Sequence, residues 1–250
     1  MDSGSNLSIP LYSRISFAIS NSKCSSTEDE SLPGGRYRLR LYFDLLLQHG
    51  PQCGLVALVN GLRMLGEDRY TVDTVFVAAK ECEFTNNGEM FSPFWLADLA
   101  NIVCETIQAK VIEFPSTKRL IQITNCDAEA ILIPYDCEKN GEPGFHSGTK
   151  SHWCLCVGAL TVSATFKGLK ESATVPYNED ACEAFVFGIQ GKSRYPGVWS
   201  IEALCRSNAQ LRELGTVRAS EELVYRLPEN GVSELSGKCV LLQRRNSIIC

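Results

Sequence analysis

Apolar residues recur at helical spacing in three segments of the first half of the chain. Between residues 55 and 65, Leu and Val fall three, four and seven positions apart, which predicts a helix with one buried face that stops at Gly66. Thr71 and Ser92 are good N-caps, and each precedes another such segment, which predicts helices from Val72 to about Cys82 and from Pro93 onward.

The second half of the chain changes to short apolar or alternating runs, which are typical of strands. We expect a short helix from Ser200 to about Ser207 and strands at Ala109–Phe114, Ala130–Tyr135, Trp153–Leu160, Ala184–Ile189, Leu223–Leu227 and Lys238–Gln243. Helices followed by mostly antiparallel strands predict an α+β domain, in which an N-terminal helical lobe packs on a sheet and leaves a cleft beside the first helix.

The ends of the chain differ in composition from its middle. Residues 1–35 are rich in Ser, and 25–35 adds Thr, Asp, Glu, Pro and Gly, so this stretch predicts a disordered tail. Residues 36–47 alternate basic with apolar residues, which suits an entering strand, although 43–47 suits a helix equally well. We therefore expect one domain over 36–245, with a short C-terminal tail over 246–250.

Overall charge and cysteine usage narrow the classes of function. A net charge of -5 argues against a protein that binds nucleic acid through phosphates, because that binding needs clustered Lys and Arg. The twelve cysteines are scattered, and the sequence shows neither a secretory signal nor an apolar run long enough to span a membrane. The sequence thus predicts reduced thiols in a cytoplasmic protein that does not associate with membranes.

Cys53 stands where a loop becomes the first predicted helix. Amides and the positive dipole end at a helix N-terminus stabilise a thiolate, which makes such a cysteine a candidate nucleophile. Gly50, Pro51 and Gly54 suit a tight approach of the chain at this point. The alternative is a buried structural cysteine, and catalysis requires a histidine elsewhere in the chain.

His152 is the best partner among the three histidines of the chain. His49 lies four residues before Cys53, too near in sequence to approach it freely, and His146 sits in a Gly-rich loop. His152 opens a strand and shares one face of it with Cys154 and Cys156. These three side chains could instead bind a metal, but alternate strand positions splay too widely to hold one ion, so we expect no metal or cofactor.

A cysteine on an early helix followed by a histidine at the head of a later strand resembles papain-like and bacteriocin-processing peptidases. In those enzymes an Asn or Asp after the next strand orients the imidazole. The corresponding strand here ends at Gln190, which we take as the orienting residue, with Asn178 and Asp180 as alternatives.

Several motifs taken together resemble those of the actin maturation protease family, in the same order along residues 39–243. These motifs are Gly-Pro-Gln-Cys-Gly-Leu-Val-Ala-Leu around Cys53, Gly88–Ser92, Leu132–Asp136, Ser151–Trp153 and Gln190–Ser193. The resemblance implies a papain-like cysteine aminopeptidase that removes the acetylated first residue, Met or Cys, from immature actin. A module that binds actin or a peptide without turnover is the alternative, and Gln190 in place of Asn or Asp favours it.

The resemblance also implies a role for each candidate residue. Cys53 attacks the first peptide bond, and His152 activates the thiol and protonates the leaving amine. The oxyanion is held by the Cys53 N–H and an amide side chain, either Gln48, five residues upstream where papain-like enzymes have six, or Gln52.

Charge and proline content bear on the partners. Actin N-termini carry acidic residues after the cleaved one, so we expect Lys150, Lys192 and Arg194 to bind them. Vertebrate members carry a proline-rich tail suited to profilin, whereas Pro10 and Pro33 are the prolines before this domain, which does not favour profilin binding.

Overall fold

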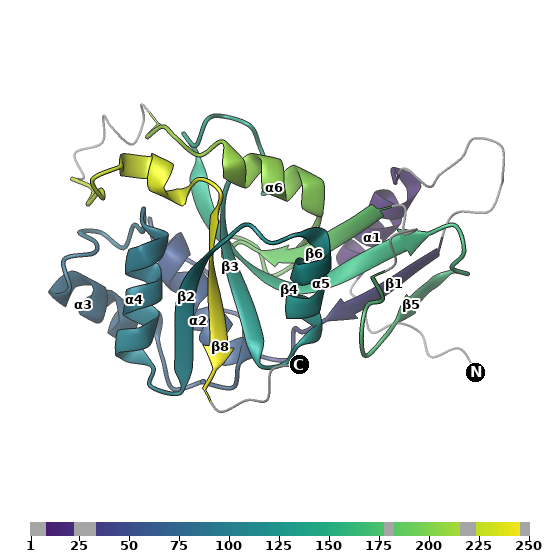
Figure 1. Ribbon diagram of the computed structural model, residues 1–250, viewed down its shortest axis with the longest axis horizontal. Helices are drawn as coiled ribbons and strands as arrows, with labels where there is room; N and C mark the ends of the chain where they lie inside the picture. The colour runs from purple at the N-terminus through teal and green to yellow at the C-terminus, as the bar shows by residue number, and fades with distance from the viewer. Residues whose placement is uncertain (1–8, 23–33, 178–182, 216–223, 246–250) are drawn as a thin grey trace.

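A computed structural model describes residues 9–22, 34–177, 183–215 and 224–245 of the chain (Figure 1). Along the sequence the elements are α1 (Ile9–Ser20), β1 (Gly34–Leu39), α2 (Cys53–Met64), α3 (Val72–Glu81), α4 (Pro93–Val103), β2 (Ile107–Glu113), α5 (Thr117–Asn125), β3 (Glu129–Asp136), β4 (Ser151–Ser163), β5 (Leu169–Glu171), β6 (Glu183–Ile189), β7 (Gly197–Ser200), α6 (Ile201–Ala209), the 3₁₀ helix η1 (Gly231–Leu235) and β8 (Lys238–Arg244).

The strands form one sheet in the order β2-β8-β3-β4-β1-β5, and β6 pairs with β4 and with β7. All pairs are antiparallel except β1 with β5. The long strand β4 bonds β3 through its first half and β1 through its second, while β6 runs along its opposite edge. As a result, β4 begins and β6 ends at the same end of the sheet.

Helices cover both faces of this sheet (Figure 1). On one face α2 packs on β3 and β4 and α4 packs on β2 and β8, around the larger apolar core. On the other face α5 and α6 enclose a second core. The predicted α+β class, with an N-terminal helical lobe on a mostly antiparallel sheet, is confirmed. Among the described residues no helix has both the length and the apolar character that a membrane crossing requires.

The three helices predicted from periodicity are confirmed as α2, α3 and α4. The side chain of Thr71 accepts a hydrogen bond from the Thr74 amide at 3.2 Å, and that of Ser92 accepts one from the Trp95 amide at 3.3 Å. Both N-caps therefore act as their residue types predict.

The predicted disordered tail over 1–35 is wrong for residues 9–22, which contain α1, and for Gly34 and Gly35, which begin β1. Leu11, Ile15, Ala18 and Ile19 are buried in the larger core. Their spacing of four, seven and eight positions is helical, so burial of this stripe outweighs the Ser-rich composition. The adjoining stretches 1–8 and 23–33 and the C-terminal tail over 246–250 lie outside the described residues.

One expected strand is absent, and one helix was not expected from the sequence. The described part of the strand predicted at 223–227 is irregular: the Val224 carbonyl accepts from Asn86 and Asn87 side chains, and the Arg226 amide donates to Glu89. The chain thus bonds to side chains there instead of to a strand. The unexpected helix is α5, although its buried Leu120, Ile121, Ile123 and Thr124 lie at helical spacing and Ser116 caps it by accepting from the Arg119 amide.

Candidate active site

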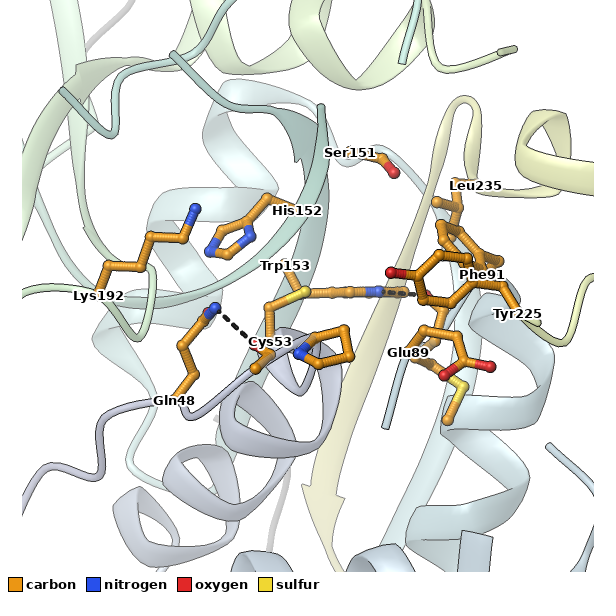
Figure 2. A pocket seen from close by; sticks show the side chains of 13 residues that line it. Gln48, Cys53, Glu89, Phe91, Ser151, His152, Trp153, Lys192, Tyr225 and Leu235 are labelled. Atoms are coloured by element: carbon orange, nitrogen blue, oxygen red, sulfur yellow. Dashed lines mark hydrogen bonds between the residues drawn. The ribbon is translucent and has the colours of Figure 1, made fainter. Parts of the chain in front are cut away.

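Cys53 is the first residue of α2, and its half-buried thiol lines a pocket of about 330 Å³ (Figure 2). The predicted cleft beside Cys53 is therefore confirmed. Because the first amides of a helix lack partners within it, they and the helix dipole create a positive field at this thiol. The pocket is lined by Gln48, Gly50, Pro51, Cys53, Glu89, Met90, Phe91, Ser151, His152, Trp153, Lys192, Tyr225 and Leu235.

Gly54 lets the start of α2 approach the sheet closely. A Cβ atom at this position would lie 2.7 Å from Met90 Cβ and 3.1 Å from Trp153 Cδ1. The indole N–H of Trp153 donates to the Met90 carbonyl at 2.8 Å, which fixes both neighbours. Glycine after Cys53 is thus a packing requirement that holds Cys53 against the start of β4.

His152 lies at the start of β4, is 4 % exposed, and lines the same pocket as Cys53, with its ring on the same side as the Cys53 sulfur (Figure 2). Its Nε2 is 2.6 Å from the backbone carbonyl oxygen of Gln190. A carbonyl can only accept, so Nε2 carries the proton and, in the neutral ring, Nδ1 carries the lone pair. This tautomer leaves Nδ1 available to accept a proton from the thiol.

The predicted role of the Gln190 side chain in orienting His152 is wrong, because the backbone carbonyl of Gln190 makes this contact. The side chain lies beside Gly141 and lines a second pocket instead. Any residue type supplies a backbone carbonyl, so the residue type at position 190 does not reveal this contact. The alternatives Asn178 and Asp180 lie outside the described residues.

Gln48 is held by the next carbonyl along the same segment. The backbone N–H of Gln48 donates to the Gly191 carbonyl at 2.8 Å, and its side-chain Nε2 donates to the Gly50 carbonyl at 3.1 Å. Nε2 has a second proton, and Figure 2 shows this nitrogen on the same side of the pocket as the Cys53 sulfur and the His152 ring. Consecutive carbonyls of residues 190 and 191 therefore place both His152 and Gln48.

Comparison with known proteins bears on this site. Residues 43–160 match the family model described as "Actin maturation protease-like, C-terminal domain". The actin maturation protease of Danio rerio is 33 % identical over 224 residues, which cover 80 % of this chain and 72 % of that protein. The chain belongs to the actin maturation protease family.

Other relatives match less of their own length. The actin maturation protease of Mus musculus is 31 % identical over 226 residues, and the match covers 79 % of this chain and 61 % of that protein. A solved structure of a C39-like peptidase from Bacillus anthracis aligns over 84 % of this chain and 99 % of its own, with a TM-score of 0.46 and 9 % identity.

In this member of the actin maturation protease family, four residues are predicted to bind the substrate, and one of them lines the pocket. Lys192 is exposed and lines the pocket beside His152. Gln52 packs against Gly88, where a Cβ would lie 2.5 Å from its Cγ, and does not line the pocket. Lys150 and Arg194 are also absent from its lining, and the Lys150 amine lies 3.4 Å from His146 Nε2.

Tyr135 is a neighbour of His152 that the sequence analysis did not single out. It pairs with His152 in the β3–β4 register, and the two rings meet edge to face with centroids 6.0 Å apart. Its hydroxyl donates to the Gly141 carbonyl at 2.9 Å. Burial, followed by the nearby Cys137 and Cys154, raises the pKa of Tyr135 well above its usual value, so the hydroxyl stays protonated and keeps this bond.

The pocket wall opposite His152 is apolar and aromatic. It consists of Met90, Phe91, Trp153, Tyr225 and Leu235. Phe91 and Tyr225 meet edge to face with ring centroids 6.0 Å apart, and Figure 2 shows them across the pocket from His152. This wall suits an uncharged side chain of moderate size.

Glu89 lies at the same wall and is 3 % exposed. Its carboxylate accepts from the backbone amides of Asn86, Asn87 and Arg226 at 2.9, 2.7 and 2.7 Å. In Figure 2 the carboxylate points away from Cys53. Glu89 therefore joins two loops at the pocket edge, and three amide donors offset its charge.

His152, Cys154 and Cys156, the residues considered as an alternative metal site, are not arranged to hold one ion. Cys154 and Cys156 are buried in the second core, and Cys154 Sγ lies 3.3 Å from the Ile133 carbonyl. Among the described residues, no three His, Cys, Asp or Glu side chains are arranged to hold a metal ion.

Proposed function

We propose that the protein is a cysteine-type aminopeptidase of the cytoplasm that removes the N-acetylated first residue, Met or Cys, from immature actin. The observation that carries the proposal is that Cys53, at the start of α2, and His152, whose Nε2–H donates to the Gln190 carbonyl, line one pocket. Membership of the actin maturation protease family supports actin as the substrate.

The proposed reaction uses two acyl transfers. His152 Nδ1 accepts the thiol proton of Cys53, and the thiolate attacks the carbonyl carbon of the first residue. The Cys53 N–H and Gln48 Nε2 hold the oxyanion. The imidazolium then protonates the leaving amine, which is the new N-terminus of actin, and leaves a thioester on Cys53. Water deprotonated by His152 hydrolyses the thioester, which releases the acetylated amino acid and restores the thiol.

The composition of the pocket supports an acetylated substrate over a free amine. An α-ammonium group would need an available carboxylate, and Glu89 already accepts three backbone hydrogen bonds. An acetylated residue is uncharged at that end, and the wall of Phe91, Trp153 and Leu235 can pack against the apolar side chain of Met or Cys.

Mass spectrometry of actin N-termini tests this function. Acetylated, unprocessed actin should lose one residue when incubated with the purified protein and stay intact with the Cys53→Ala variant. Release of free acetyl-methionine or acetyl-cysteine is the second readout. Cleavage at any internal bond instead would contradict an aminopeptidase, and binding of actin without cleavage would favour the non-catalytic module.

Replacing Gln48 with Ala tests the oxyanion site. We expect kcat to fall by about a hundredfold, with KM nearly unchanged, because the Nε2 donor acts mainly on the charged intermediate. Gln52→Ala is the matched control, since Gln52 packs against Gly88. Equal losses in the two variants, measured with an acetylated peptide, would count against a specific role for Gln48.

Reversing the charge of Lys192 tests recognition of acidic residues after the scissile bond. We expect Lys192→Glu to raise KM for an acidic acetylated peptide by about tenfold at low salt and by less at high salt, because exposed charges are screened. Arg194 does not line the pocket, so Arg194→Glu should raise KM less than Lys192→Glu does. An unchanged KM for Lys192→Glu at low ionic strength would place acidic recognition elsewhere.

A further inference from the structure

A second pocket, of about 290 Å³, lies on the other side of the segment that holds His152. It is formed by α1, by the β3–β4 loop and by the chain from Gln190 into β7. Its lining comprises Ser13, Arg14, Phe17, Asn140, Gly141, Glu142, Gln190, Ser193, Tyr195, Gly197, Val198 and Trp199. We call this the α1 pocket.

The segment 190–193 separates the two pockets. Lys192 lines the pocket of Cys53, whereas Gln190 and Ser193 line the α1 pocket. The backbone carbonyl of Gln190 accepts from His152 Nε2–H, so one residue both contacts His152 and lines the α1 pocket. An extended peptide advances about 3.3 Å per residue, so residues a few positions after the scissile bond lie beyond the pocket of Cys53.

The α1 pocket presents aromatic side chains at the protein surface. Two aromatic side chains of the lining face solvent, since Phe17 is 68 % exposed and Tyr195 is 45 % exposed.

The walls of the α1 pocket are fixed before any ligand arrives. Leu11 and Ile15 anchor α1 in the larger core, and an Arg14 guanidinium N–H donates to the Pro196 carbonyl at 3.1 Å. Phe17 lies outside that core, so it does not serve to anchor α1.

We propose that the α1 pocket is an exosite that binds the polypeptide substrate C-terminal to the scissile bond. Side chains of an extended peptide pack on Phe17 and Tyr195, the two exposed rings of this lining. This inference rests on the proposed peptidase function. It explains how an enzyme that removes one residue gains affinity for a particular protein through contacts beyond that residue.

Substrate length provides the test. Two acetylated peptides from the actin N-terminus are compared, one of about four residues and one of about twelve, the longer being able to span both pockets at about 3.3 Å per residue. We expect kcat/KM of the wild-type protein to be at least about tenfold higher for the longer peptide, as loss of one buried aromatic contact commonly costs. Phe17→Ala should bring this ratio close to one.

Phe94→Ala is the matched control, because Phe94 is also an exposed phenylalanine on a helix, 46 % exposed on α4, and lines neither pocket. Its length ratio should equal that of the wild type. If Phe17→Ala lowers the melting temperature, Tyr195→Ala replaces it, since Tyr195 lies outside α1. A wild-type ratio near one, or a ratio that neither variant changes, overturns the exosite.

Binding measured without turnover separates this inference from the proposed function. The longer peptide is titrated by fluorescence anisotropy into Cys53→Ala protein with and without Phe17→Ala. Binding that weakens with Phe17→Ala supports the exosite even if the wild type cleaves neither peptide, in which case the proposed function alone fails. Cleavage of both peptides with binding that does not depend on Phe17 overturns the exosite and leaves the peptidase proposal standing.

Discussion

Cys53→Ala protein should release no acetylated amino acid from actin, with turnover reduced by at least about a thousandfold because covalent catalysis is lost with the nucleophile. The substitution removes one half-buried sulfur at the start of α2, so the melting temperature should stay close to that of the wild type. Liquid chromatography with mass spectrometry of the released acetyl-methionine or acetyl-cysteine gives the rate. Full activity in this variant would contradict the assignment of the nucleophile.

Cys205→Ala is the control for this prediction. Cys205 is also half-buried, but it lies on α6, and burial followed by the charge of Glu202 raises its pKa. We expect Cys205→Ala protein to keep wild-type turnover. Iodoacetamide at about pH 6, with the modified peptides mapped, should label Cys53 well before Cys205, because the thiolate is the reactive form. Slower labelling of Cys53 than of Cys205 would indicate an inert thiol.

The part of the fold that could be predicted from the sequence is the part whose pattern is local. The helices α2, α3 and α4 each combine an apolar stripe with a cap or stop residue, so their existence and bounds follow from short-range rules. In contrast, α1 depends on burial against β7 and the core, which is a tertiary effect. Its Ser-rich sequence gives a weaker signal than its packing.

Tertiary context also decides whether a chain segment becomes a strand. Residues 224–227 have an apolar pattern typical of a strand, yet their backbone is bonded by Asn86, Asn87 and Glu89 side chains from a distant loop. Nothing within that segment signals these partners. The strand β6 has a similar pattern and is a strand because β4 offers it an open edge.

The site shows the same division between residue type and backbone. The positions of Cys53 at the start of a helix and of His152 at the start of a strand could be predicted, and both residues line one pocket. The partner of His152 is a peptide carbonyl, which every residue possesses, so reading residue types led to the side chain of Gln190. Tyr135 could have been found from the strand register. It lies near the end of β3 and pairs with His152 at the start of β4.

Replacing His152 with Ala should lower kcat by about a thousandfold, because the variant has no group to accept the thiol proton or to protonate the leaving amine. His152→Gln serves as a second variant if the buried ring is needed for folding. The control is His146→Ala, since His146 is bonded to Glu138 at 2.7 Å and does not line the pocket of Cys53. Alkylation of Cys53 at about pH 6 should also slow in the His152 variants, because the imidazolium that stabilises the thiolate is gone. A His146→Ala protein that loses turnover, beside a His152→Ala protein that keeps it, would transfer the role of general base to His146.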